Sequence, residues 1–133
     1  MGVLAGDGMQ AADSEPLLVR FVVVGRMAGE RSWRKVWQAD IVARAEEAIE
    51  TVPETSRDNR ISLWLFPMKD GGVAIDSRIV LRSPVHASCV TSDVLRPGQP
   101  AEVLSVKRED GEYRVFQMAT ALTGAGSVHE VRP

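Results

Sequence analysis

Ile61-Ser-Leu-Trp-Leu-Phe-Pro-Met-Lys-Asp-Gly-Gly-Val-Ala-Ile-Asp-Ser-Arg-Ile-Val-Leu81 sets an Asp-Gly pair between two strand-like runs. Asp-Gly suits a two-residue loop with positive φ, whose twist matches that of the flanking strands. In the second run, apolar side chains alternate with more polar ones, which is typical of a half-buried strand. The apolar set is Val73, Ile75, Ile79 and Leu81. The stretch therefore predicts an antiparallel hairpin that turns at Asp70-Gly71.

A second Asp-Gly pair, Asp110-Gly111, lies within the strand-like run from Ala101 to Leu122. We expect a second hairpin there. With Asp110-Gly111 as the two-residue loop, Arg108 faces Tyr113 and Val106 faces Val115.

The N-terminal half predicts one strand and one helix. Leu17 to Val24 is rich in β-branched residues and almost continuously apolar, so we expect a buried strand. Ser32 is a reasonable helix N-cap, and Pro53 would close the helix. Between them the apolar residues recur at helical spacing, which predicts a helix of about twenty residues. These residues are Trp33, Val36, Trp37, Ile41, Ala45, Ala48, Ile49 and Val52. We expect Trp33 and Trp37, together with Trp64 on the sheet, to help build the core between helix and sheet.

The predicted order, β-α-β-β-β-β, is that of an α+β roll, with one long helix packed on a curved, mainly antiparallel sheet of about five strands. This order resembles that of cystatin-like folds and, less closely, of the hot-dog fold. The turn Met68-Lys-Asp-Gly-Gly72 lacks the Gln-x-Val-x-Gly hairpin of cystatin inhibitors, so the resemblance does not imply protease inhibition. We predict a single domain over residues 16–123, with flexible tails at 1–15 and 124–133.

Composition restricts the classes of function. The chain of 133 residues is 44% hydrophobic and 26% charged, which is ordinary for a globular protein. Its net charge of −2 gives no global attraction to nucleic acid or acidic membranes, so neither is expected as a partner. Cys89 is the single cysteine, which favours a reducing, cytoplasmic location. One cysteine and two histidines also argue against a metal site, and no motif indicates a cofactor.

Four basic residues surround the N-terminus of the predicted helix: Arg26, Arg31, Arg34 and Lys35. Free N–H groups and guanidinium groups there would converge on an anionic ligand or a partner's carboxylate. The alternative is that these are ordinary solvated charges, with Glu30 paired to Arg34.

A second group, His86, Ser88, Cys89 and Asp93, contains a nucleophile and a base. On a strand, His86 and Ser88 share one face while Cys89 points to the other, so no catalytic pair is predicted. Asp76, Arg78 and His86 are the polar groups that a ligand pocket would use.

Two functions are consistent with this reading. A single helix covers only one face of a sheet. Strands with apolar side chains on both faces therefore leave apolar surface exposed on the other face. This favours a non-catalytic protein-interaction or adaptor module that forms a homodimer or binds a protein partner through its outer sheet face, with the basic segment as a further contact. The alternative is a small-molecule-binding protein or enzyme with its cavity between sheet and helix.

Overall fold

The structure is a computed structural model that describes residues 16–53 and 58–121. The described residues form eight strands and no helix, so the predicted α+β class is wrong. The predicted tails lie outside the described residues, and the single-domain boundary at 16–123 stays a prediction. The strands are β1 (Leu17–Met27), β2 (Arg34–Ala43), β3 (Ala48–Thr51), β4 (Arg60–Pro67), β5 (Val73–Leu81), β6 (Ala87–Leu95), β7 (Ala101–Arg108) and β8 (Gly111–Ala121).

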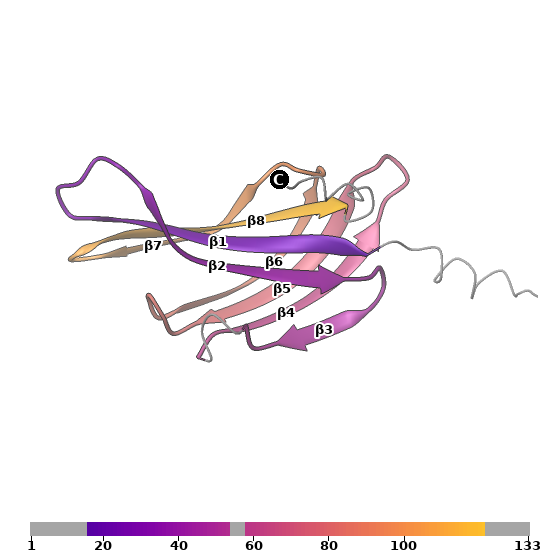
Figure 1. The fold of residues 1–133 in the computed structure, drawn as a ribbon, viewed down its shortest axis with the longest axis horizontal. Coiled ribbons are helices and arrows are strands. Elements are labelled where there is room, and N and C mark those ends of the chain that lie inside the picture. Colours follow the sequence, from indigo (N-terminus) through magenta and orange to yellow (C-terminus); the bar gives the residue numbers. More distant parts are fainter. Residues whose placement is uncertain (1–15, 54–57, 122–133) are drawn as a thin grey trace, which may run out of the picture.

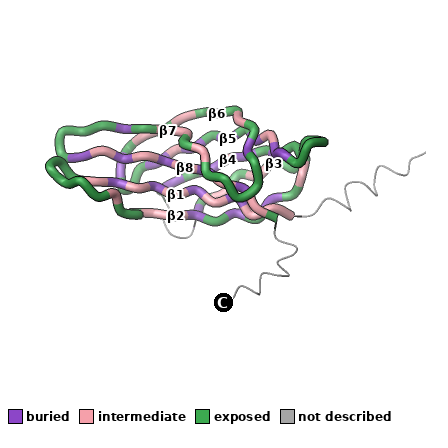
Figure 2. The backbone as a smooth tube through the Cα atoms, turned by 90° about the horizontal axis from the view of Figure 1, so that it is seen from above, coloured by how far each residue is buried: buried purple, intermediate pink, exposed green. Residues whose placement is uncertain are grey.

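The strands form two four-stranded antiparallel sheets, in the orders β2-β1-β8-β7 and β3-β4-β5-β6, which pack face to face (Figure 1). The chain crosses from one sheet to the other in two places, between β2 and β3 and between β6 and β7. The strands therefore follow one another in chain order around the sandwich. The β1–β2 and β7–β8 hairpins project beyond the β3–β6 sheet at one end (Figure 1). Exposed residues gather on these projecting turns (Figure 2).

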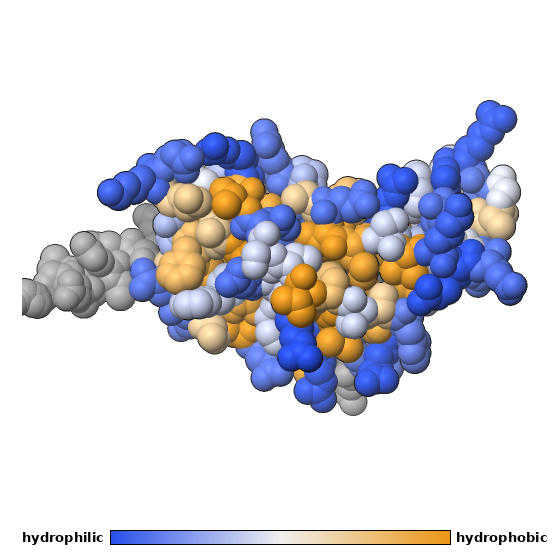
Figure 3. Space-filling view, turned by 180° about the vertical axis from the view of Figure 1, so that it is seen from behind, coloured by the Kyte–Doolittle hydropathy of each residue, from blue (hydrophilic) through white to orange (hydrophobic). Residues whose placement is uncertain are grey.

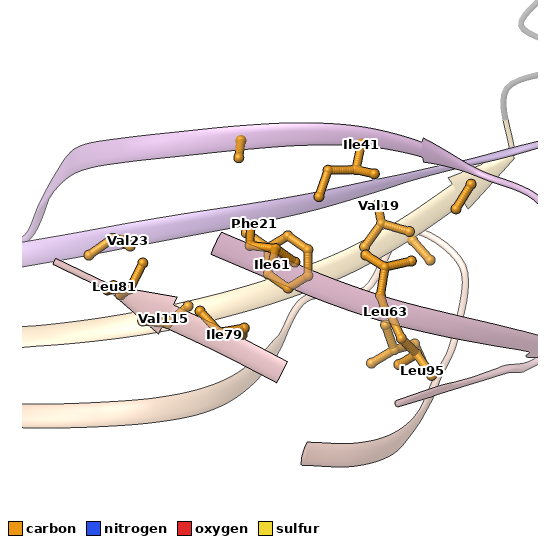
Figure 4. Close-up of a cluster of buried hydrophobic side chains, with 14 of the residues drawn as sticks. Val19, Phe21, Val23, Ile41, Ile61, Leu63, Ile79, Leu81, Leu95 and Val115 are labelled. Carbon is orange, nitrogen blue, oxygen red and sulfur yellow. The ribbon is translucent and has the colours of Figure 1, made fainter. Parts of the chain in front are cut away.

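The core lies between the sheets and is built from alternate residues of each strand. Val19, Phe21 and Val23 point inward from β1, and Ile61, Leu63 and Leu65 point inward from β4; none is more than 3% exposed. Figure 4 shows the labelled side chains of β1 and β4 clustered with Ile79 and Leu81 of β5 and with Val115 of β8. Each fully buried aliphatic side chain of this kind stabilises the fold by about 1.5–3 kcal/mol. The predicted inward set on β5 is confirmed, since Val73, Ile75, Ile79 and Leu81 are all buried.

The segment predicted as a helix forms β2, a turn and β3 instead. Ala39, Ile41 and Ala43 are buried while their neighbours point outward, so the segment has the period of a strand. β2 pairs with β1 from Leu17↔Ala43 to Gly25↔Arg34. Glu46, with φ of 61°, turns the chain into β3, and its N–H donates to the Leu65 carbonyl at 2.7 Å. Pairing with β1 and burial in the core therefore outweigh the local helical spacing.

The first predicted hairpin is confirmed, with a loop one residue longer. The Met68 N–H donates to the Gly72 carbonyl at 2.8 Å, and the Gly71 N–H donates to the Met68 carbonyl at 3.1 Å. The loop is therefore Lys69-Asp70-Gly71, with Gly71 at a φ of 91°, the usual form of a three-residue hairpin. The Asp70 carboxylate accepts from the Gly72 N–H at 3.0 Å, which explains the aspartate.

We expect Gly71→Ala to destabilise the protein by about 1–2 kcal/mol, because an L side chain at this φ is strained. Asparagine tolerates the left-handed region, so Gly71→Asn should lose less than half as much. Urea unfolding of the two variants tests this, and equal losses would contradict it.

The second hairpin exists, but its predicted register is wrong. Arg108 pairs with Gly111 and Val106 with Tyr113, so the two-residue loop is Glu109-Asp110. Gly111 serves a different purpose from a turn glycine. A Cβ there would lie 2.5 Å from the Arg26 carbonyl oxygen of β1, so the close approach of β1 and β8 requires glycine.

Candidate functional site

The outer face of the β3–β6 sheet carries an exposed apolar patch. Trp64 and Phe66 of β4 point outward, and their rings lie 4.5 Å apart. Val90 and Val94 of β6 are 76% and 56% exposed on the same face. The view from behind shows hydrophobic side chains gathered across the middle of the molecule (Figure 3). We call these four residues the outer patch: Trp64, Phe66, Val90 and Val94.

The pairing of β4 with β5 and of β5 with β6 places the central outward-facing residues in two rows across the strands. The Asp76 row consists of Trp64, Asp76 and Ser92, and the Arg78 row of Ser62, Arg78 and Val90. A shallow groove of about 620 Å³ runs over both rows and is also lined by Ala48 and Glu50 of β3. It is hollow because small side chains, such as Ser62, lie beside the large indole of Trp64.

The predicted pocket residues are only partly brought together. Asp76 and Arg78 both line the outer groove. The Asp76 carboxylate accepts from the Ser92 hydroxyl at 2.7 Å. His86 lies in the turn before β6, where its carbonyl accepts from Arg108 Nη2 at 2.8 Å. The predicted cavity between sheet and helix does not exist, since the described chain has no helix.

The basic segment lies at the projecting end, and two of its four basic residues form ion pairs. Arg26 is paired with Glu112 at 2.9 Å, and the alternative prediction of a Glu30–Arg34 pair is confirmed at 3.0 Å. The hydrogen bond from Arg26 holds the pKa of Glu112 below its usual value. Lys35 donates to Gln38 at 2.9 Å, and Arg31 lies exposed in the β1–β2 turn. The described chain has no helix here, so no helix N-terminal N–H groups are available to bind an anion at this segment.

The tryptophans do not gather in the core as the sequence suggested. Trp37 packs against the core, but Trp64 is 41% exposed in the outer patch. The guanidinium groups of Arg26 and Arg114 both lie over the Trp33 ring, each 4.6 Å from its centroid. Arg–aromatic stacking of this kind fixes the ring on the outer surface of the β1–β8 pair.

Two buried polar sites were missed from the sequence. Gln117 lies between the sheets, where it accepts from the Ser77 hydroxyl at 2.9 Å and donates to Asp93 at 3.3 Å. Asn59 is fully buried before β4 and bonds to the backbone of Arg82 and Ser83. Both satisfy groups that burial would otherwise leave without partners, so we assign them to the fold.

The group around Cys89 is divided between the two faces of β6. Cys89 faces inward and is half-buried, while the neighbouring Ser88 faces outward, as predicted. Burial raises the pKa of the Cys89 thiol, which disfavours the reactive thiolate. Across residues 16–53 and 58–121, no three metal-ligating side chains cluster together.

No protein-family model matches the chain, and no curated protein or solved structure is significantly similar to it. None of the residues that the structure describes belongs to a helix long and apolar enough to cross a membrane.

Proposed function

We propose that this protein is a small, non-catalytic interaction module whose docking surface is the outer face of the β3–β6 sheet. The observation that carries the proposal is the clustering of exposed apolar side chains. Four of the nine large hydrophobic residues exposed in the described chain form the outer patch, and a fifth, Met68, lies in the adjoining β4–β5 hairpin. Exposed apolar side chains that are concentrated on one face mark an interaction surface more often than scattered ones do.

The opposite outer face supports the choice by contrast. There Arg20 and Asp40 form a two-point ion pair at 2.8 and 3.1 Å beside a shallow hollow lined by Val22, Phe116 and Met118. Hydrogen bonding from Arg20 keeps the pKa of Asp40 low, so this pair stays charged at neutral pH. The three apolar side chains of the hollow are themselves half-buried. This sheet carries three of the nine exposed large hydrophobic residues, Met27, Val36 and Val42, against four in the outer patch.

Burial of the outer patch would remove apolar surface from water at roughly 25 cal/mol per Å². The proposal includes a cytoplasmic location, because the only cysteine of the sequence can form no intrachain disulfide. Small-molecule binding in the groove beside Trp64 is the second candidate, favoured by Asp76 and Arg78 at its floor.

Site-specific photo-crosslinking tests the docking surface. A photoreactive phenylalanine analogue at Val90 should form a covalent adduct with a polypeptide when cells that express the protein are irradiated. The same analogue at Val42, which is 57% exposed on β2, is the matched control and should form none.

The added change Trp64→Ser should abolish the adduct at Val90, because it removes the largest side chain of the outer patch. Equal adducts from both positions, or none from Val90, would contradict the proposal. The second candidate would be favoured if native mass spectrometry instead showed a small molecule bound to the parent protein and released on denaturation.

A further inference from the structure

We infer that the occupant of this face is a second copy of the chain, packed about a twofold axis that runs across the strands above Ser77. This inference rests on the proposed function, since it names the partner of the same docking surface. A twofold interface needs one surface that is complementary to itself in charge, shape and extent.

The charges meet the first requirement. Asp76 and Arg78 flank Ser77 on β5 and both point outward at the middle of the sheet. The twofold axis exchanges the Asp76 row with the Arg78 row. Asp76 of each copy then lies over Arg78 of the second copy, which gives two equivalent pairs of opposite charge. Within residues 16–53 and 58–121, Arg78 forms no ion pair, so its charge is available to the partner.

The shape meets the second requirement. Because Trp64 belongs to the Asp76 row and Ser62 to the Arg78 row, the axis places each indole over Ser62 of the second copy. Ser62 lines the groove of about 620 Å³, so each copy offers both an indole and a hollow for the other's. On β6 the same exchange places Val90, which is 76% exposed, over the small Ser92. Large residues therefore meet small ones on both neighbours of β5.

The extent of the face allows a small interface. Three strands of about eight residues and the four-residue β3 lie about 4.8 Å apart, with a rise of about 3.3 Å per residue. The face therefore covers about 440 Å² in projection, or about 880 Å² for the two copies together. A specific interface is expected to bury about 1,000 Å² or more in total, and side chains that stand above the sheet make the buried area larger than its projection.

Sedimentation velocity of the purified full chain, with charge-reversed variants, tests the inference. The parent should sediment as a dimer at tens of micromolar. Asp76→Arg and Arg78→Asp should each weaken dimerisation at least tenfold, because each places like charges opposite one another in both pairs. An equimolar mixture of the two variants should restore dimers to the parent level, since only the mixed dimer has opposite charges in both pairs. Recovery in the mixture also shows that both variants are folded.

Other outcomes overturn the inference and separate it from the proposed function. A dimer that is lost in Trp64→Ser but unaffected by the charge variants would refute the axis and leave the docking surface intact. A monomeric parent, together with a crosslink from Val90 to a different polypeptide, would refute the second copy but not the proposed function. A dimer that none of these variants weakens, together with no crosslink from Val90, would refute both.

Discussion

The Gln117→Glu variant should be less stable than the parent by about 3–5 kcal/mol at pH 7, since it buries an unpaired carboxylate. Gln117 is fully buried, and its amide nitrogen lies 3.3 Å from an Asp93 carboxylate oxygen. The substitution replaces that donor with an acceptor and places two carboxyl groups together between the sheets. The size of the effect follows from the lack of solvent around Gln117.

The stability loss should depend on pH with a definite sign. Burial and the neighbouring carboxylate raise the pKa of the introduced carboxyl group in the folded state above the unfolded value of about 4.3. Between these two pKa values the folded state binds more protons than the unfolded state, so stability falls as pH rises. Urea unfolding at pH 5 and pH 7.5 should therefore show the smaller deficit at pH 5. Gln117→Leu, which adds no charge, is the control, and an equal deficit at both values would contradict the prediction.

Asn59→Ala should destabilise the protein by about 2–4 kcal/mol, since buried backbone groups would lose their partners. The Asn59 side chain accepts from the Arg82 N–H at 2.8 Å and the Ser83 N–H at 3.2 Å, and donates to the Ser83 carbonyl at 2.8 Å. It thereby joins the start of β4 to the chain that leaves β5. Thermal unfolding should show a lower midpoint.

Asp58→Ala is the matched control for Asn59, because the adjacent Asp58 side chain is exposed. Its stability should stay within about 0.5 kcal/mol of the parent. If the two variants were equally stable, the three hydrogen bonds of Asn59 would have no net effect on folding.

The helix prediction failed because its main apolar pair is ambiguous. Trp37 and Ile41 are four residues apart, a spacing that places them on one face of either a helix or a strand. Ala39 and Ala43 complete the strand alternation, but alanine gives little signal by hydrophobicity alone. The charge order did contain a warning, since Arg34 and Lys35 would stand at the N-terminus of the helix and Glu46 near its C-terminus. What decides the segment is its pairing with β1, a contact that local sequence does not contain.

The outer patch could be anticipated only in part. Strands with two apolar faces led us to expect surplus apolar surface, and Ile61 to Phe66 is one of them. The same alternation that buries Ile61, Leu63 and Leu65 directs Trp64 outward, so assigning Trp64 to the core ignored the pattern.

The inward polar residues had a usable signal as well. Ser77 occupies the phase of Ile75 and Ile79, and Gln117 that of Val115. A polar residue in an apolar phase indicates a buried polar partner. Which partner it meets depends on how the two sheets face each other, because Ser77 and Gln117 come from different sheets.

Native mass spectrometry of the purified chain tests the central claim most directly. We expect twice the chain mass of 14.5 kDa at tens of micromolar concentration. Val90→Asp should reduce this to a single chain, because it places a carboxylate in the interface, and Val42→Asp on the opposite sheet should leave the dimer unchanged. A single-chain mass for the parent at every concentration, or a dimer that responds to Val42→Asp and not to Val90→Asp, would contradict the account.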